Sequence, residues 1–530
     1  MRVRTLFAVG VVGVAAALLW ALPAVAAERI YWDNYRQEPA SIGFSALDGS
    51  GGGLLNTTGA TIKDPEGMTY DSATGRIYVA SSNSDEIIWV NVDGSGAGTL
   101  SAPGAPIEDP VGVAVDPATR TIYWVNGEGN GAAEGSIAWA KLDGSGGGML
   151  NTSGASLSEP YRLAVDPSGG RVYWTNFGTT PQTISYANLD NSGGGGELDV
   201  SGASEPNDDG LAIDSAAGRI YWLNSSSISY ASLSGGNGGD LAPAGATFDE
   251  PYGLALDPSS GVLYWANYGV EEGEPNGIGF ESISGTGGGA ITPTTLTDGP
   301  QDPVILKSPS GTGAPQVSGD STPGSVLSCS QGSWAADYAG AFVYQAPQGY
   351  AYQWSRDGSP IAGANSNIVM ASDSGDYSCT VTATNHEGSA TQSSSAFRVA
   401  PAPQPVTPAP PKLTLKVLPH KGHAKAGKAA TFKAIVRNVG GTPAQGARVC
   451  IQIPKKQRKA LKAPKCRGLG AIAPGGKRVA KLRVHAKRWA HGAYKLAFRV
   501  RGAGGAGPVT RKLVVRGGHG KSHRHGKRAG

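Results

Sequence analysis

A hexapeptide built around an aromatic pair recurs six times in this chain of 530 residues. The copies are RIYWDN (29–34), RIYVAS (76–81), TIYWVN (121–126), RVYWTN (171–176), RIYWLN (219–224) and VLYWAN (262–267). They follow one another at intervals of about 47 residues. A period of this length indicates a repeat architecture, in which each unit buries its apolar surface only by packing on its neighbours.

Each repeat predicts four β-strands. Every hexapeptide after the first follows an apolar stretch that begins at a proline, as in PVGVAVDPAT from Pro110. A third strand, a glycine-rich turn and a short fourth strand come next, as in IAWAKLDGSGGG from Ile137. The alternation of apolar and polar residues and the tight Asp-Gly or Gly-Gly turns are typical of antiparallel strands.

The first repeat lacks its first strand, and a matching segment, DPVILKSP, follows the sixth repeat from Asp302. Pairing residues 303–307 with the repeat of residues 29–56 closes a ring and leaves no unpaired terminal strand. The sequence therefore predicts an all-β chain that begins with a six-bladed β-propeller over residues 27–310.

These residues give the chain a resemblance to the YWTD six-bladed propellers of the low-density-lipoprotein-receptor family, over residues 28–308. The fourth position of the YWTD motif departs from the family pattern, because it is asparagine in five repeats and serine in the second. The resemblance implies the fold and leaves the function open, since propellers host both binding and catalysis.

An export signal is predicted at residues 1–26. Arg2 and Arg4 precede an apolar run over residues 6–21, and a small-x-small cleavage site follows at residues 24–26. This order is typical of a secretory signal peptide, and a retained membrane anchor is the alternative. The mature protein is expected outside the cell or at the cell wall, where disulfides form.

Two further domains follow the propeller. Residues 311–400 contain Cys329, Trp354, Tyr377 and Cys379, and they resemble an immunoglobulin-like domain. The resemblance implies a Cys329–Cys379 bridge between two sheets and a tyrosine corner at Tyr377. Residues 401–411 hold six prolines and predict a stiff extended linker.

Residues 412–516 predict about seven strands and resemble CARDB-like adhesion modules, which makes this the second predicted β-sandwich. Cys450 and Cys466 lie across one loop, where a disulfide is expected. A metal site is the alternative, but acidic or paired cysteine ligands are missing nearby. Residues 517–530 are polar and glycine-rich, so a disordered basic tail is expected.

Charge is strongly divided along the chain. Residues 28–310 carry 35 acidic and 10 basic side chains, whereas residues 401–530 carry 31 basic and no acidic ones. A segment this basic is expected to bind anions. Because the protein is predicted to be exported, an anionic cell-envelope polymer or a lipid surface is favoured over nucleic acid as its partner. No nucleic-acid-binding motif is present in the sequence.

The propeller has neither histidine nor cysteine, so a Ser-His-Asp or Cys-His catalytic site cannot be built within it. An acid instead precedes the proline at the start of each predicted innermost strand. These acids are Asp64, Asp109, Glu159, Glu205, Glu250 and Asp302. Arg162 is a cation two residues after its proline, where most repeats have glycine.

Six-fold repetition places these acids on one face. We interpret that face as a binding platform for a protein or glycan ligand, with a divalent cation as a possible occupant and no other cofactor or metal expected. The simpler interpretation is that an acid before proline only begins a turn. The favoured function is a secreted or cell-surface, non-enzymatic binding or adhesion protein. A carboxylate-based carbohydrate-active enzyme and a purely structural surface protein are the alternatives.

Overall fold

The structure is a computed structural model that describes residues 28–127, 135–207, 209–241, 245–269, 277–293 and 298–517. The predicted signal peptide lies outside the described residues, as does all of the predicted tail after Gly517. The described chain divides into two compact units, one up to Ala402 and one from Pro403. The domain boundaries from the sequence stay predictions.

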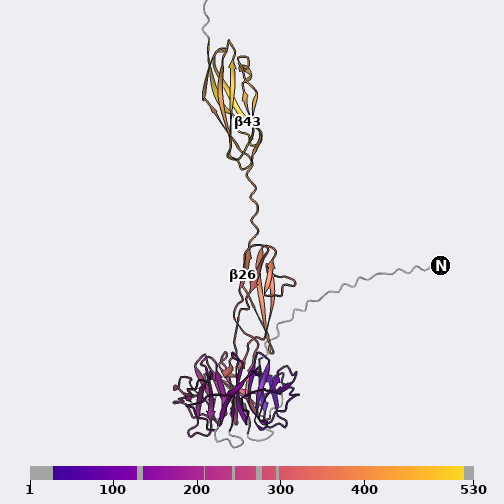
Figure 1. The fold of residues 1–530 in the computed structure, drawn as a ribbon, viewed down its shortest axis with the longest axis vertical. Coiled ribbons are helices and arrows are strands. Elements are labelled where there is room, and N and C mark those ends of the chain that lie inside the picture. Colours follow the sequence, from indigo (N-terminus) through magenta and orange to yellow (C-terminus); the bar gives the residue numbers. More distant parts are fainter. Residues whose placement is uncertain are drawn as a thin grey trace, which may run out of the picture. The chain divides into compact units, whose positions relative to one another are not determined.

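The first unit contains a ring of six four-stranded antiparallel blades (Figure 1). Blade 1 comprises β24 (Pro300–Leu306), β1 (Arg29–Asn34), β2 (Ser41–Ala46) and β3 (Gly53–Leu54). Blade 2 comprises β4 (Pro65–Asp71), β5 (Arg76–Ser81), β6 (Glu86–Asn91) and β7 (Ala97–Thr99), with the 3-10 turn η1 (Ser82–Ser84). Blade 3 comprises β8 (Pro110–Asp116), β9 (Thr121–Asn126), β10 (Ser136–Lys141) and β11 (Gly147–Met149).

Blade 4 comprises β12 (Pro160–Asp166), β13 (Arg171–Asn176), β14 (Thr183–Asn188) and β15 (Gly196–Glu197). Blade 5 comprises β16 (Leu211–Asp214), β17 (Arg219–Leu223), β18 (Ile228–Ser232) and β19 (Gly239–Leu241). Blade 6 comprises β20 (Pro251–Asp257), β21 (Val262–Asn267), β22 (Ile278–Ser282) and β23 (Gly288–Ile291). The all-β, six-bladed prediction is confirmed.

The aromatic pair of the hexapeptide builds the core between blades. Its tryptophans are fully buried in five blades, at Trp32, Trp124, Trp174, Trp222 and Trp265. Blade 2 has the smaller Val79 at this position, which is also fully buried. Side chains alternate across a strand, so the neighbouring tyrosine packs on the opposite surface of the same blade. Both surfaces of each second strand are therefore buried.

Ring closure occurs in blade 1, as predicted, because β24 pairs with β1. The register differs from the sequence interpretation. Pro300 lies opposite Asn34, just as Pro160 lies opposite Asn176 in blade 4. Gly299, and not Asp302, therefore takes the place of the acid before the proline, and the interpretation of Asp302 as the sixth such acid is wrong.

The middle domain, from residue 311 to 400, is a β-sandwich held by the Cys329–Cys379 disulfide. Its strands are β25 (Gly311–Gly313), β26 (Val317–Gly319), β27 (Ser325–Cys329), β28 (Ser333–Trp334), β30 (Gly349–Arg356), β31 (Ser359–Pro360), β32 (Ile368–Ala371), β33 (Gly375–Asn385), β34 (Gly388–Ser393) and β35 (Phe397–Val399). Trp354 is fully buried beside the disulfide, and the Tyr377 hydroxyl donates to the Asp373 carbonyl oxygen at 3.1 Å. The immunoglobulin-like assignment itself stays a prediction.

An insertion in the middle domain packs into the propeller. It contains the 3-10 turn η3 (Ala339–Ala341) and β29 (Val343–Tyr344), and β29 extends blade 1 by pairing in parallel with β24. A methyl group at Gly340 would lie 2.2 Å from the Val165 carbonyl oxygen, so only glycine permits this approach. The Tyr344 hydroxyl hydrogen-bonds Thr69 at 2.8 Å. Propeller and middle domain therefore share one packed interface.

The second unit contains the C-terminal domain, a sandwich of two sheets over residues 412–516. One sheet has the order β36 (Leu413–Leu418), β38 (Ala429–Asn438), β42 (Lys477–Ala486), β40 (Leu461–Lys462). The other has the order β37 (Lys421–Lys425), β44 (Val509–Arg516), β43 (Gly492–Arg501), β39 (Ala444–Gln452), β41 (Cys466–Ile472), and η4 (Lys455–Gln457) follows β39. The expected Cys450–Cys466 disulfide joins β39 to β41. The CARDB-like assignment stays a prediction.

Residues 401–411 form no helix or strand. In the part of the chain that the structure describes, no helix is long and apolar enough to cross a membrane.

Candidate functional site

Four of the acids before the prolines share one unusual backbone conformation, which Glu205 of blade 5 does not adopt. Asp64, Asp109, Glu159 and Glu250 have φ values of 45° or 46°, in the left-handed region that side chains disfavour by roughly 1 kcal/mol. The carbonyl oxygen of each acid accepts a hydrogen bond from the residue after the second strand of its blade, as from Ser82 N–H to Asp64 at 3.1 Å. Gly299 makes the same bond to Tyr35 N–H at 3.0 Å, with φ of 58°.

The comparison with Gly299 shows whether the turn depends on the backbone or on the acidic side chain. Gly299 shows that the turn forms without an acid, and glycine would form it with less strain. The turn alone therefore does not explain why the other blades have carboxylates there. Glu159, Glu205 and Glu250 are exposed, whereas Asp64 and Asp109 are half-buried.

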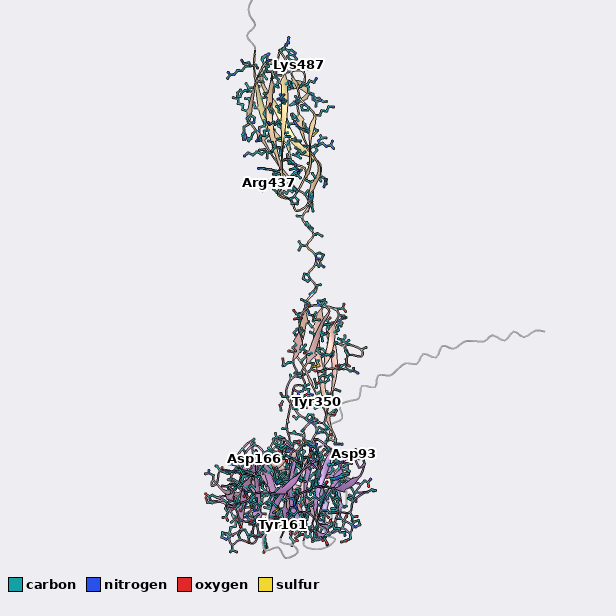
Figure 2. The ribbon with its side chains drawn as sticks, viewed as in Figure 1. Asp93, Tyr161, Asp166, Tyr350, Arg437 and Lys487 are labelled. Carbon is teal, nitrogen blue, oxygen red and sulfur yellow. A yellow bond between two sulfur atoms is a disulfide. The ribbon has the colours of Figure 1, made fainter. Side chains whose placement is uncertain are left out.

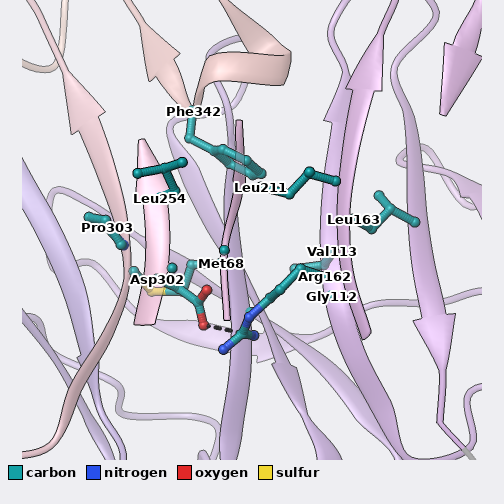
Figure 3. A pocket seen from close by; sticks show the side chains of 13 residues that line it. Met68, Gly112, Val113, Arg162, Leu163, Leu211, Leu254, Asp302, Pro303 and Phe342 are labelled. Carbon is teal, nitrogen blue, oxygen red and sulfur yellow. Dashed lines mark ion pairs between the residues drawn. The ribbon is translucent and has the colours of Figure 1, made fainter. Parts of the chain in front are cut away.

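The central channel is lined by one residue of each blade at the same level. These residues are Gly67, Gly112, Arg162, Gly210, Gly253 and Asp302. The innermost strands approach closely there, because a methyl group at Gly112 would lie 2.4 Å from the Tyr161 carbonyl oxygen. The two exceptions to glycine, Arg162 and Asp302, form an ion pair of 3.2 Å (Figure 3).

Arg162 is a buried cation with unused donors. Its side chain is 5% exposed, and Nη1 faces Asp302 and donates to the Glu66 carbonyl oxygen. The Nε and Nη2 atoms have no hydrogen-bond partner. Burial opposes the charge of Arg162, but Asp302, Tyr161, Glu66 and Asp33 together raise its pKa, so the guanidinium stays charged.

Asp33 is the most isolated acid of the channel. It is fully buried, and neither carboxylate oxygen accepts a hydrogen bond of good geometry, although the backbone of Gln301 interacts favourably with the carboxylate. Burial and the nearby Asp302 carboxylate hold the pKa of Asp33 well above its ordinary value, and Arg162 offsets part of this effect. A buried carboxyl of this kind is costly unless it is protonated or meets a cation.

Glu66 lies half-buried beside this pair and accepts a hydrogen bond from the Tyr161 hydroxyl. Burial raises its pKa to about 7, although Arg162 and the Tyr161 hydrogen bond oppose the increase. We call Asp33, Glu66, Tyr161, Arg162 and Asp302 the channel cluster. It contains three carboxyl groups against one guanidinium.

The central channel is narrow, and it is closed at the end away from the Arg162–Asp302 pair. Its free volume is about 20 Å³, enough for roughly one water molecule. Phe342 of the middle-domain insertion lines it on the side away from the Arg162–Asp302 pair (Figure 3). Figure 2 shows Tyr161 and Asp166, the two ends of β12, on opposite faces of the propeller. Access to the channel cluster is therefore from the face on which the innermost strands begin.

No three histidine, cysteine, aspartate or glutamate side chains within the described ranges are grouped closely enough to hold a metal ion. The divalent cation at the acidic face therefore stays a prediction. Among the predicted binding residues, the structure brings Arg162 and Asp302 into contact with each other.

Sequence reasoning missed Asp33, Glu66 and Tyr161. A signal for Asp33 was available in the repeats, because the fifth position of the hexapeptide is otherwise Ala80, Val125, Thr175, Leu223 and Ala266. Asp33 is the one charged residue at this position, so it marks blade 1 as different from the other blades. Glu66 and Tyr161 are harder to find, since the residue after the proline differs between most blades.

No protein-family model matches this chain. No curated protein matches it either. Several solved structures are similar over about half of it. A chain of a nidogen/laminin complex has a TM-score of 0.42 and 16% identity, covering 52% of this chain and 98% of its own. The hydrazine synthase of Kuenenia stuttgartiensis has a TM-score of 0.34 and 16% identity, covering 45% and 70%. A protein of unknown function from Desulfotomaculum acetoxidans has a TM-score of 0.35 and 12% identity, covering 52% and 98%.

Proposed function

We propose that this is an exported, non-enzymatic binding protein whose propeller binds a cationic group of a protein or glycan ligand at the channel cluster. The observation that carries the proposal is the excess of buried carboxyl groups, with neither oxygen of Asp33 accepting a hydrogen bond of good geometry. An ammonium group that reaches this cluster would offset the cost of ionising it. The acids before the prolines add negative charge to the same face and would steer such a ligand.

The size of the channel favours binding over catalysis. Glycoside hydrolysis needs two carboxyl groups roughly 5 to 9.5 Å apart with a sugar between them. A free volume of about 20 Å³ leaves no room for a sugar ring beside Arg162 and Asp302. A ligand would instead insert the end of one side chain, or a metal ion, from the open face.

The test is calorimetric titration of the mature full-length chain with an oligolysine peptide, at low and high salt and with or without calcium. Asp33→Asn and Glu66→Gln remove charge from the channel cluster, and Asp93→Asn is the control, because Asp93 lies in an exposed turn. We expect salt-sensitive binding that Asp33→Asn weakens about tenfold and Asp93→Asn leaves unchanged. Equal effects of Asp33→Asn and Asp93→Asn would contradict the site, and calcium-dependent binding alone would favour a metal ion.

We propose further that the C-terminal domain attaches the protein to an anionic polymer or lipid surface. Residues 412–516 contain 27 lysines and arginines and no acid. Like charges lie directly opposite each other across neighbouring strands, at Lys433 and Lys481 and at Arg437 and Lys477. Such pairs destabilise a sheet, and an anion bound across them would relieve the repulsion.

The Lys433→Glu variant distinguishes an effect on anion binding from an effect on the stability of the domain. It converts a repulsive pair into an attractive one, so the domain should become slightly more stable while its affinity for anions falls. Lys63→Glu, an exposed change of the same size in the propeller, is the control. We would measure sedimentation with phosphatidylglycerol vesicles, with phosphatidylcholine vesicles as the neutral reference and soluble polyphosphate as a competitor. Equal losses for both variants would contradict the assignment to this domain.

A further inference from the structure

The groove between blades 3 and 4 is lined by an aromatic residue of the third strand of blade 3. In every blade the tyrosine of the second strand lies opposite an aromatic residue of the third strand. These residues are Phe44, Trp89, Trp139, Tyr186, Tyr230 and Phe280. Each is partly buried on the flank of its blade.

An arginine covers this aromatic ring in four blades. The closest case is blade 2, where the Arg76 guanidinium lies 3.8 Å from the Trp89 ring centre. Arg29, Arg171 and Arg219 lie over the corresponding rings at 5.5, 4.3 and 4.9 Å. Blade 3 has Thr121 and blade 6 has Val262 at this position, so the rings of Trp139 and Phe280 have no such cover.

At two junctions of the propeller a basic side chain reaches across to the neighbouring blade. Between blades 2 and 3, Arg120 reaches back to Asp71 with an N–O distance of 2.6 Å. Between blades 6 and 1, Lys307 reaches Asp257 at 2.9 Å. Blade 4 has Gly170 where blade 3 has Arg120, and glycine is also the residue at this position in blades 2, 5 and 6, so no arginine at this position reaches toward Asp116.

The groove between blades 3 and 4 has a volume of about 630 Å³ and is lined by Trp139, Thr121 and Lys141 of blade 3 and by Gly170, Asn188 and Asp190 of blade 4, among others. This volume is typical of small-molecule sites, which are roughly 300–1,000 Å³. The indole Nε1 of Trp139 has no hydrogen-bond partner, whereas Nε1 of Trp89 donates to the Thr99 carbonyl oxygen at 3.2 Å.

The polar groups of the groove have mixed charge. The Lys141 ammonium donates to Thr121 Oγ1 at 2.7 Å and to the Thr119 carbonyl oxygen at 3.2 Å, which leaves one N–H for a ligand. Asp190 is exposed, and hydrogen bonds from Ser192 lower its pKa, so it accepts as a carboxylate. Lys141 disfavours a cationic ligand and the carboxylates disfavour an anionic one.

We propose that this groove is a saccharide-binding site for a neutral glycan. A pyranose ring has an apolar C–H face that stacks on an indole, and hydroxyl groups that both donate and accept. Trp139 supplies the aromatic surface, and Lys141, Asn188 and Asp190 supply the polar partners. The site is independent of the channel cluster.

Thr121→Arg tests the proposal by introducing the arginine that four other blades have at this position, which should cover the ring of Trp139. Trp139→Ala removes the aromatic surface, and Trp89→Ala is the control, because Trp89 is already covered. We would titrate the full-length chain with cellohexaose, chitohexaose and maltohexaose and, separately, with an oligoarginine peptide. Unchanged melting temperature of Thr121→Arg shows that the variant is folded.

We expect at least one hexasaccharide to bind the wild type and the Trp89→Ala variant, and to bind Thr121→Arg and Trp139→Ala at least about tenfold more weakly. Absence of binding by all three saccharides would overturn the proposal, as would full binding by Thr121→Arg. Binding of the oligoarginine peptide alone, lost in Thr121→Arg, would assign the groove to a basic protein partner instead.

Discussion

Arg162 and Asp302 face each other across the propeller channel at 3.2 Å, and each stands where the other four blades have glycine. Both side chains are at least nine-tenths buried. The pair therefore joins blade 4 to the closing strand of blade 1. At this level of the channel the other four blades have glycine, and their backbones lie close to one another. Its two members are coupled, because either one alone would be a buried charge without compensation.

This coupling predicts a strongly non-additive mutant cycle. Arg162→Gly or Asp302→Gly alone should lower the free energy of unfolding by about 3 kcal/mol, because each leaves its partner unpaired. The double variant should lower it by clearly less than the sum, since glycine is the native residue at this level in four blades. Urea denaturation of the full-length chain measures all four proteins. Additive losses would show that the ion pair contributes no coupling.

Glu66 predicts a specific dependence of stability on pH. Its folded pKa is raised from 4.5 to about 7, so between these values the unfolded chain loses the proton and the folded chain keeps it. The free energy of unfolding therefore falls as pH rises through this window, by about 3 kcal/mol, and the contribution is lost above pH 7.

Glu66→Gln should remove this fall. The variant should match the wild type near pH 4.5 and exceed its stability above pH 7, as measured by melting temperature across the range. Glu197→Gln changes an exposed acid of blade 4 and serves as the control. A parallel pH profile for wild type and Glu66→Gln would show that Glu66 titrates as an ordinary surface acid.

Phe342 is predicted to hold the middle domain on the propeller. Phe342→Ala should cost about 3 kcal/mol, because it removes a buried ring and leaves a cavity at the end of the channel. Hydrogen exchange should rise in β29 and along β24, to which β29 is paired. Val326→Ala, at a side chain that is 55% exposed, is the control. Unchanged exchange in both strands would mean that the contact is not needed for docking.

The Cys450–Cys466 disulfide predicts a stability difference confined to the C-terminal domain. It closes a loop with a sequence separation of 16 residues, worth about 3 kcal/mol in the chain-entropy model. Replacing both cysteines by serine should lower the unfolding midpoint of that domain and leave the propeller transition in place. A shift in the propeller transition instead would contradict the division into two units.

The repeat unit and the closing strand could be predicted from the sequence because they depend on spacing along the chain. The Cys450–Cys466 disulfide followed from the position of both residues across one loop, and the Cys329–Cys379 disulfide from the resemblance to an immunoglobulin-like domain. The prediction from the sequence was wrong at Asp302. Its Asp-Pro dipeptide resembles the acid-proline pairs of the other blades, but it does not occupy the same place in the pairing of the innermost and second strands. Gly299 fills that place because the turn requires a left-handed backbone and a carbonyl acceptor, and glycine supplies both. The Arg162–Asp302 contact and the Phe342 insertion depend on three-dimensional packing between segments far apart in sequence.

The position of β24 also sets the order in which this molecule can be completed during synthesis. Blades 2 to 6 are each made of consecutive strands, so each has all its strands as soon as it has been synthesised. Blade 1 instead has β1 as an open edge until residue 306 has been made, and β24 is covered by β29 only when residue 344 follows. The first blade to be synthesised is therefore the last to be finished, and until then the growing chain carries an unpaired strand at its leading end.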